Sequence, residues 1–83
     1  MQRFLLVFES LEPSLFETTN NLRNHLDIAC KGKYSLKVLF RSLHPELVKK
    51  YNLRGAPALI ALNKNQIAYG KFKKKENIKD LLL

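Results

Sequence analysis

The side chains of this sequence that could perform chemistry are a single cysteine, two histidines and a few serines. A thiol enzyme needs a thiolate that is stabilised by a helix N-terminus or by a neighbouring cation. Cys30 falls instead at the C-terminal end of the first predicted helix, where the helix dipole disfavours a thiolate. A free cysteine is typically a small buried apolar residue. We therefore predict that Cys30 packs in or beside the core and that the chain does not exchange disulfides.

The two histidines belong to no recognisable metal or catalytic set. Neither His25 nor His44 has a cysteine, a second histidine or paired carboxylates at metal-ligand spacing. We expect His25 on the flank of a helix and His44 near the start of the next helix, where it could act as a cap. A role as proton carrier or metal ligand is the alternative. The serines lack the context of a nucleophile elbow, and no glycine-rich phosphate loop is present. We predict a protein that is not an enzyme and needs no cofactor or metal.

The sequence departs from an ordinary protein surface at Gly70-Lys-Phe-Lys-Lys-Lys-Glu76. Three consecutive lysines precede the last predicted helix, although a helix N-terminus favours anions over cations. The run is either a solvated charge cluster that protects an edge strand or a contact surface for an acidic partner. In the second interpretation the predicted contact residues are Lys71, Phe72 as the apolar element, Lys73, Lys74 and Lys75, extended by Lys49, Lys50 and Arg54.

The net charge of +8 is distributed unevenly along the 83 residues. Residues 1–30 carry two basic and four acidic side chains, whereas residues 31–83 carry thirteen basic and three acidic ones. Such an excess steers a protein toward an acidic protein surface, a nucleic acid or an anionic membrane. No apolar run approaches the ~20 residues of a membrane span, and few aromatic side chains lie near the lysines to stack on bases. An acidic protein surface is therefore the preferred partner, with nucleic acid as the alternative.

Residues 51–62 organise the predicted fold. Residues 58–62 form a short apolar run typical of a buried strand. Pro57 stands at the start of this strand, where a missing N–H does least harm to the ladder. A helix precedes the strand, and a second strand follows it across the turn Asn63-Lys-Asn65. This pattern is typical of the C-terminal half of a thioredoxin-like fold, in which the bond before the proline is cis. We therefore predict a cis Ala56–Pro57 bond.

The other elements complete this fold. The predicted strands are residues 2–8, 34–40, 57–62 and 66–71, and the predicted helices are residues 14–30, 45–51 and 74–83. Residues 2–8 are apolar throughout, like a central strand covered on both faces, and residues 34–40 alternate like an edge strand. The first helix shows a capping-box pattern, Ser14 and Glu17, and an apolar stripe formed by Leu15, Leu22, Leu26 and Ala29. The last helix should turn Ile78, Leu81 and Leu82 toward the sheet. The sequence thus predicts one domain, residues 1–83, of the α/β class: a βαβαββα three-layer sandwich with a mixed four-stranded sheet in the order 2-1-3-4.

From Pro13 to Pro57 the chain resembles, without a gap, the KaiB family of circadian-clock proteins. The matching residues include Pro13, Leu22, Leu26, Lys31-Gly32, Tyr34, Leu36-Lys-Val38, Pro45, Leu47, Leu53 and Pro57. Gly70 and the terminal helix also fall into place after a shorter turn. The stretch from Pro45 to Leu59 is similar to the N-terminal sensory domain of the clock kinase SasA as well, and that domain is itself KaiB-like.

The resemblance implies a thioredoxin-like, non-enzymatic interaction module of circadian-clock or two-component signalling. Its partner would be the ATPase KaiC or a histidine kinase. Two positions at which basic residues help KaiB engage its ATPase are Glu17 and Asn52 in this sequence. The single cysteine and the lack of a signal-peptide pattern favour a cytoplasmic location. A basic, nucleic-acid-binding domain of thioredoxin fold is the alternative function.

Overall fold

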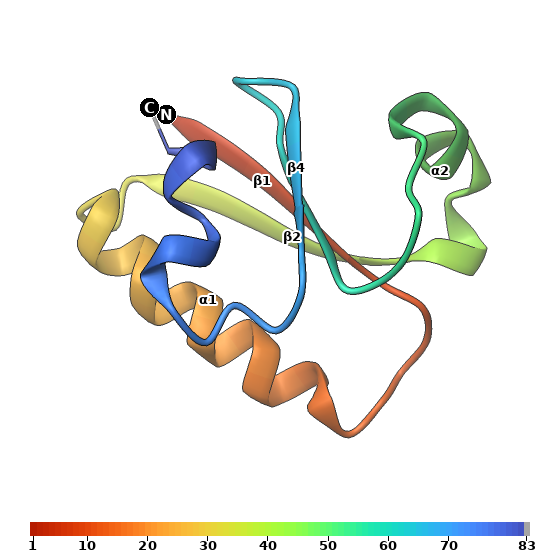
Figure 1. Cartoon of the computed structure of the whole chain (residues 1–83), viewed down its shortest axis with the longest axis horizontal. Coiled ribbons are helices and arrows are strands. Elements are labelled where there is room, and N and C mark those ends of the chain that lie inside the picture. Colours follow the sequence, from red (N-terminus) through yellow and green to blue (C-terminus); the bar gives the residue numbers. More distant parts are fainter. Residues whose placement is uncertain (83) are drawn as a thin grey trace.

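In the computed structural model, which describes residues 1–82, four strands form one mixed sheet with helices on both faces (Figure 1). The strands are β1 (Gln2–Phe8), β2 (Tyr34–Phe40), β3 (Ala58–Ala61) and β4 (Gln66–Tyr69). The α-helices are α1 (Ser14–Ala29) and α2 (Pro45–Tyr51). Three short 3₁₀ turns follow β2 and β4: η1 (Arg41–Leu43), η2 (Lys75–Asn77) and η3 (Lys79–Leu81). We refer to η2 and η3 together as the C-terminal turns.

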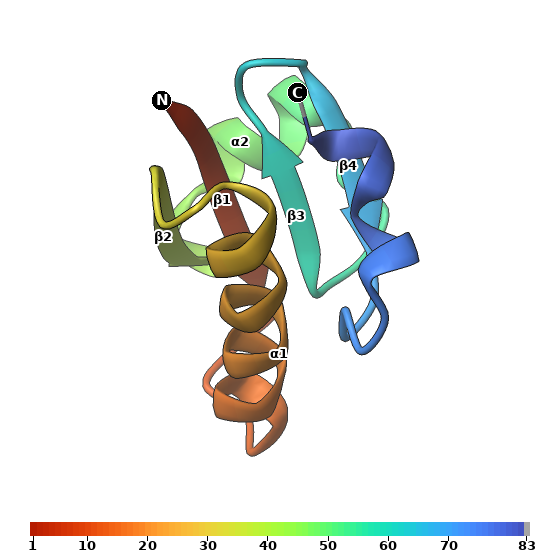
Figure 2. The ribbon, with the colours of Figure 1, turned by 90° about the vertical axis from the view of Figure 1, so that its left-hand side faces the viewer.

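The sheet has the predicted order, β2-β1-β3-β4. Strand β1 is parallel to β2 and antiparallel to β3, and β3 is antiparallel to β4. Helix α1 and the C-terminal turns lie against one face, whereas α2 lies against the other (Figure 2). The α/β class and the sheet order of a thioredoxin-like fold are therefore confirmed. The peptide bond between Ala56 and Pro57 is cis, as predicted.

The central strand β1 divides the core into two layers because its side chains alternate between the faces of the sheet. Phe4, Leu6 and Phe8 pack into the larger cluster under α1 and the C-terminal turns. Val7 and the partly buried Leu5 belong to the smaller cluster under α2. A strand that is buried on both sides must be apolar throughout, and this is the pattern that predicts its position.

The buried stripe of α1 differs from the predicted one at its C-terminal end. Leu15, Leu22 and Leu26 are buried as expected, but Ala29 is exposed. Thr18 completes the stripe instead, because positions 15, 18, 22 and 26 follow the spacing of three and four residues that keeps side chains on one helical face. Ala29 is the last residue of the helix, and the core beneath that end is filled by Cys30.

The predicted capping box at the start of α1 is wrong. Ser14 is the first helical residue, Pro13 before it already has helical backbone angles, and no side chain caps this end. The chain begins to coil earlier, since the Leu15 N–H donates to the Glu12 carbonyl oxygen at 3.0 Å. Ser14 is therefore one or two positions too far into the helix to act as its cap.

Thr18 is a buried polar residue that offers a stability test. Its Oγ1 has no hydrogen-bond partner among the described residues, although the side chain is fully buried. Because an unsatisfied buried hydroxyl is destabilising, Thr18→Val should raise the free energy of unfolding by about 1 kcal/mol in urea titrations. Both residues are β-branched, so the helix propensity hardly changes. Thr18→Ser, which keeps the hydroxyl and loses the methyl group, should instead lower stability; an equal effect of both variants would contradict the explanation.

The predicted last helix, residues 74–83, is wrong in type. The chain forms the two 3₁₀ turns η2 and η3 there, and residue 83 lies outside the described residues. Ile78 and Leu81 are buried as predicted, because residues three apart share a face in 3₁₀ geometry as well. Leu82 is half-buried and packs against the same cluster. The strands of the hairpin are also shorter than predicted, since β3 covers residues 58–61 and β4 covers residues 66–69.

Candidate interaction surface

The loop of residues 9–13 occupies the position at which a thioredoxin-fold redox enzyme carries its reactive cysteines, and here it contains none. Val7 pairs with Ala58 across the sheet, so this loop begins next to Pro57. Leu11 stands in the loop with 77% of its surface exposed. The described side chains of this region therefore place no thiol or histidine at the mouth of α1.

Cys30 lies at the opposite end of α1, in the core, as predicted. Its backbone N–H donates to the Leu26 carbonyl oxygen at 2.8 Å, and the Gln2 Nε2 group donates to its Sγ at 3.2 Å. Burial raises the pKa of the Cys30 thiol above its ordinary value. A buried thiol with a raised pKa is a poor nucleophile at neutral pH.

Cys30→Ser should lower the free energy of unfolding by about 1–2 kcal/mol at neutral pH without changing the fold. Below the unfolded-state pKa of about 8.5, the Cys30 thiol is protonated in the folded and in the unfolded protein, so its raised folded-state pKa costs the wild type no stability there. Wild-type stability then falls as the pH rises toward the folded pKa, while a serine does not titrate. The stability difference between the two proteins should therefore narrow above that pH in urea titrations. A difference that is constant from pH 7 to 10 would contradict the expectation.

The histidines have structural partners. The His25 Nε2–H donates to the Lys73 carbonyl oxygen at 3.2 Å. His44 immediately precedes α2, but its side chain does not cap the helix, which corrects that expectation. Its Nδ1 lies 3.2 Å from Oε1 of Glu46, whose pKa is held below its ordinary value by the residue's own backbone N–H and then by His44. Within residues 1–82, no three side chains of the metal-binding types gather into a cluster.

Residues 71–75, which we call the basic segment, combine exposed lysines with one buried aromatic ring. Lys71, Lys73, Lys74 and Lys75 are exposed. Phe72 is only 1% exposed and belongs to the larger core cluster. The expectation that Phe72 offers an apolar contact to a partner is therefore wrong. Phe72 has a left-handed backbone, with φ of 54°, which turns its ring inward while its neighbours stay in solvent.

Two side chains of α1 hold the basic segment in place. Asn21 Nδ2 donates to the Lys71 carbonyl oxygen at 3.3 Å, and His25 bonds to the carbonyl of Lys73. Asn21 and His25 are four residues apart and therefore lie on the same face of the helix. Their spacing could have suggested a shared face, but nothing local in the sequence indicates a partner about fifty positions away.

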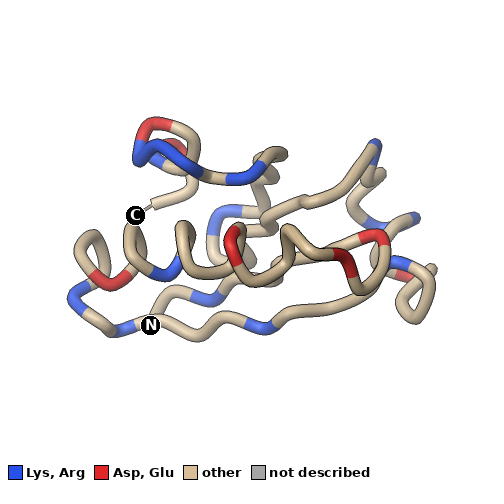
Figure 3. The backbone as a smooth tube through the Cα atoms, turned by 90° about the horizontal axis from the view of Figure 1, so that it is seen from below, with Lys and Arg blue, Asp and Glu red and all other residues tan. Residues whose placement is uncertain are grey.

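The other three predicted contact residues do not join this segment into one patch. Lys49 and Lys50 lie on α2, against the opposite face of the sheet, and the Lys50 ammonium stands 5.4 Å from the centre of the Tyr51 ring. The backbone N–H of Arg54 donates to the hydroxyl of Tyr69 on β4 at 3.2 Å. Figure 3 shows basic residues spread around the molecule, with several in succession along the C-terminal segment. The eight predicted residues therefore divide between two faces.

The lysines of the basic segment are not neutralised by carboxylates of the described chain. Among residues 1–82 the ion pair is Arg41 with Glu9 at 4.0 Å, and the His44 side chain lies 3.2 Å from that of Glu46; neither contact involves a lysine. The backbone N–H of Lys74 donates to Asn77 Oδ1 at 3.2 Å, which fixes the segment where it enters η2. The segment therefore carries four exposed lysines on a backbone that hydrogen bonds hold in place.

No protein-family model matches this chain, and no curated protein matches it. Among residues 1–82, neither α-helix has the length and apolar character needed to cross a bilayer.

Proposed function

We propose that this chain is a non-catalytic protein-interaction module whose basic segment binds an acidic surface of a partner protein. The observation that carries the proposal is a row of exposed, unpaired lysines on a backbone held by Asn21, His25 and the buried ring of Phe72. A held segment loses little conformational entropy when a partner docks. Exposed charges of one sign speed association and select the orientation of the encounter.

The resemblance to the KaiB family supports a partner from clock or two-component signalling. A ring-forming ATPase such as KaiC, or a histidine kinase that carries the domain, is the proposed partner class. Its contact surface would be acidic, to complement Lys71 and residues 73–75. The proposed location is the cytoplasm, in line with the single buried cysteine.

Nucleic acid is the competing class, and the burial of Phe72 argues against it. Proteins that bind single strands stack bases on exposed aromatic rings. Near the basic segment Tyr69 is 45% exposed, whereas Phe72 is inside the core. A lysine row with little stacking surface fits an acidic protein better.

The test is capture of the partner from the native host by the wild-type chain and by a charge-reversed variant. The variant combines Lys73→Glu, Lys74→Glu and Lys75→Glu. A control with the same change in net charge combines Lys37→Glu, Lys49→Glu and Lys50→Glu, which are exposed positions away from the basic segment. The proposal expects one acidic protein that is retained by the wild type and the control and lost by the first variant. Equal retention by all three would show that the basic segment is only a solvated charge cluster. Capture that is lost on nuclease treatment would favour nucleic acid as the partner.

A further inference from the structure

Strand β4 forms one edge of the sheet, and its outward backbone groups follow from the hydrogen bonds and the register of the sheet. The Gly70 N–H donates to the Pro57 carbonyl oxygen at 3.1 Å, so Gly70 and Pro57 form a hydrogen-bonded pair. In antiparallel strands such pairs alternate with non-bonded ones. The register Leu59↔Ala68 and Ile60↔Ile67 then turns the backbone groups of Ala68 toward β3 and those of Ile67 away from it.

The hydrogen bonds between β3 and β1 lead to the same assignment of the backbone groups of β4. The Leu62 N–H donates to the Arg3 carbonyl oxygen at 3.0 Å, and Ile60 pairs with Leu5. By the same alternation, Ile60 directs its backbone groups toward β1 and leaves Leu59 and Ala61 to bond β4. The N–H and C=O groups of Ile67 and Tyr69 therefore point away from the sheet. Within residues 1–82, no hydrogen bond outside the strand ladders reaches them.

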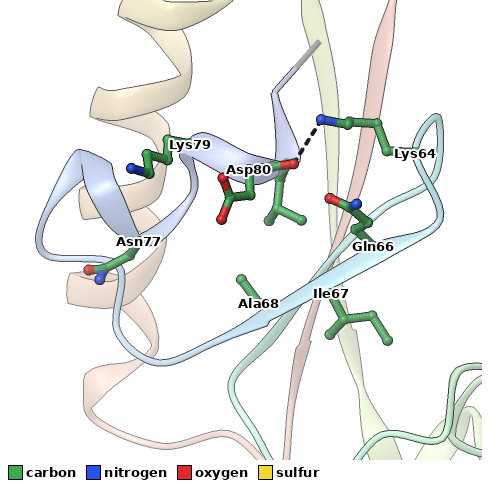
Figure 4. Close-up of a pocket in the computed structure, with 8 residues that line it drawn as sticks. Lys64, Gln66, Ile67, Ala68, Asn77, Lys79 and Asp80 are labelled. Atoms are coloured by element: carbon green, nitrogen blue, oxygen red, sulfur yellow. Dashed lines mark hydrogen bonds between the residues drawn. The ribbon is translucent and has the colours of Figure 1, made fainter.

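A cavity of about 600 Å³ lies between β4 and the C-terminal turns (Figure 4). The side chains of Gln66 and Ala68 point toward the turns, whereas that of Ile67 points away from them. Lys64 spans the upper end, where its Nζ donates to the carbonyl oxygens of Asp80 and Leu82 at 2.8 and 3.0 Å. The free edge of β4 thus lies beside a cavity that side chains of an added strand could enter.

The charges around this edge select its occupant. Lys64 precedes β4, Lys71 follows it and Lys79 lines the cavity, while the carboxylate of Asp80 is the single acidic group among the cavity-lining residues. A second copy of the chain would bring these lysines against their own equivalents. An acidic strand would complement them.

We propose that the free edge of β4 binds an extended, acidic segment of a partner protein as a fifth strand of the sheet. Main-chain hydrogen bonds to Ile67 and Tyr69 provide the register, and alternate side chains of the added strand enter the cavity. The inference deepens the proposed function, because the added strand would belong to the partner that the basic segment attracts.

The probe is a ten-residue peptide of alternating glutamate and valine, added to the intact chain and followed by amide hydrogen exchange. In the free protein the amides of Ile67 and Tyr69 should exchange quickly and that of Ala68 slowly. Saturating peptide should slow exchange at Ile67 and Tyr69 by tenfold or more. A lysine-valine peptide should not, and neither should the glutamate-valine peptide with every backbone nitrogen methylated, because that peptide has no N–H donor on either edge.

Two proline variants test which backbone N–H groups of β4 point outward and which bond β3. Ile67→Pro removes an outward N–H, so the fold should survive while peptide affinity falls roughly three- to tenfold relative to Ile67→Ala, which corrects for the lost side chain. Ala68→Pro removes a ladder N–H and should lower the thermal midpoint instead. If Ile67→Pro fails to fold, the comparison of methylated and unmethylated peptides still decides the point.

Each outcome has one meaning. Absence of binding, binding without protection of Ile67 and Tyr69, or equal binding of the lysine peptide would overturn the edge site. Protection that grows with protein concentration alone would show a second copy as the occupant and would also overturn it. If the reversal of residues 73–75 abolishes partner capture while Ile67→Pro leaves that capture unchanged, the proposed function stands and this inference falls. If the peptide binds at β4 but charge reversal leaves partner capture unchanged, the basic segment loses its role and the edge site remains.

Discussion

Replacing Phe72 by alanine should lower the free energy of unfolding by about 3–5 kcal/mol, a large loss for a single substitution. The side chain is 1% exposed and packs in the larger core cluster with Ile78 and Leu81. Its removal leaves a cavity beneath the C-terminal turns, which have little regular structure of their own to compensate. Because small domains are stable by only about 5–15 kcal/mol, the variant should be near the limit of folding.

The matched control is Phe16→Ala on α1. This second phenylalanine is 71% exposed, so its loss should change stability by less than about 0.5 kcal/mol. Alanine at position 72 keeps a side chain in the left-handed backbone, with φ of 54° in the native protein, so the substitution relieves no backbone strain. Urea titrations of the two variants measure the comparison directly. An equal loss of unfolding free energy in both variants would contradict the burial of Phe72 in the core.

Reversing the charge of Lys73, Lys74 and Lys75 together should slow association with the captured partner by about tenfold or more at low ionic strength. The lysines are exposed and carry no ion pair within the described chain, so their field is open to an approaching acidic surface. Stopped-flow rates at increasing salt should converge for wild type and variant, since the Debye length shortens to about 8 Å at 0.15 M salt and about 3 Å at 1 M.

Two comparisons make this measurement specific. The control with Lys37, Lys49 and Lys50 reversed carries the same net charge and should slow association by less than about threefold, because its changes lie away from the basic segment. The thermal midpoint of the first variant should stay close to that of the wild type. No α-helix begins at residue 74, since η2 is a three-residue 3₁₀ turn, so a gain from relieving a helix-dipole clash is not expected. Equal slowing in both triple variants would mean that net charge alone controls the encounter.

Local sequence pattern determines most of the sheet. An apolar run flanked by turns predicts a buried strand whatever its neighbours, so β1 and β3 are correctly located. The alternation of residues 34–38 correctly predicts the edge strand β2. The order of the strands follows, because a βαβ unit and a hairpin leave few ways to build one sheet. The stripe of α1 is predicted at Leu15, Leu22 and Leu26 for the same periodic reason. The pattern fails at Thr18, because a polar residue at a buried position carries no apolar signal.

The C-terminal segment is decided by tertiary contacts. A lysine run next to an apolar pattern is compatible with an α-helix and with turns, and the spacing of Ile78 and Leu81 suits both. The side chain of Phe72 could reach solvent or the core, and the choice depends on the left-handed backbone and on the space left under α1. The bonds from Asn21 and His25 join parts of the chain about fifty residues apart. Sequence by itself therefore determined that this protein is a basic, thioredoxin-like α/β domain with a row of lysines. Only the tertiary structure decided that the aromatic ring among those lysines is core, because burial depends on which distant residues fill the neighbouring space.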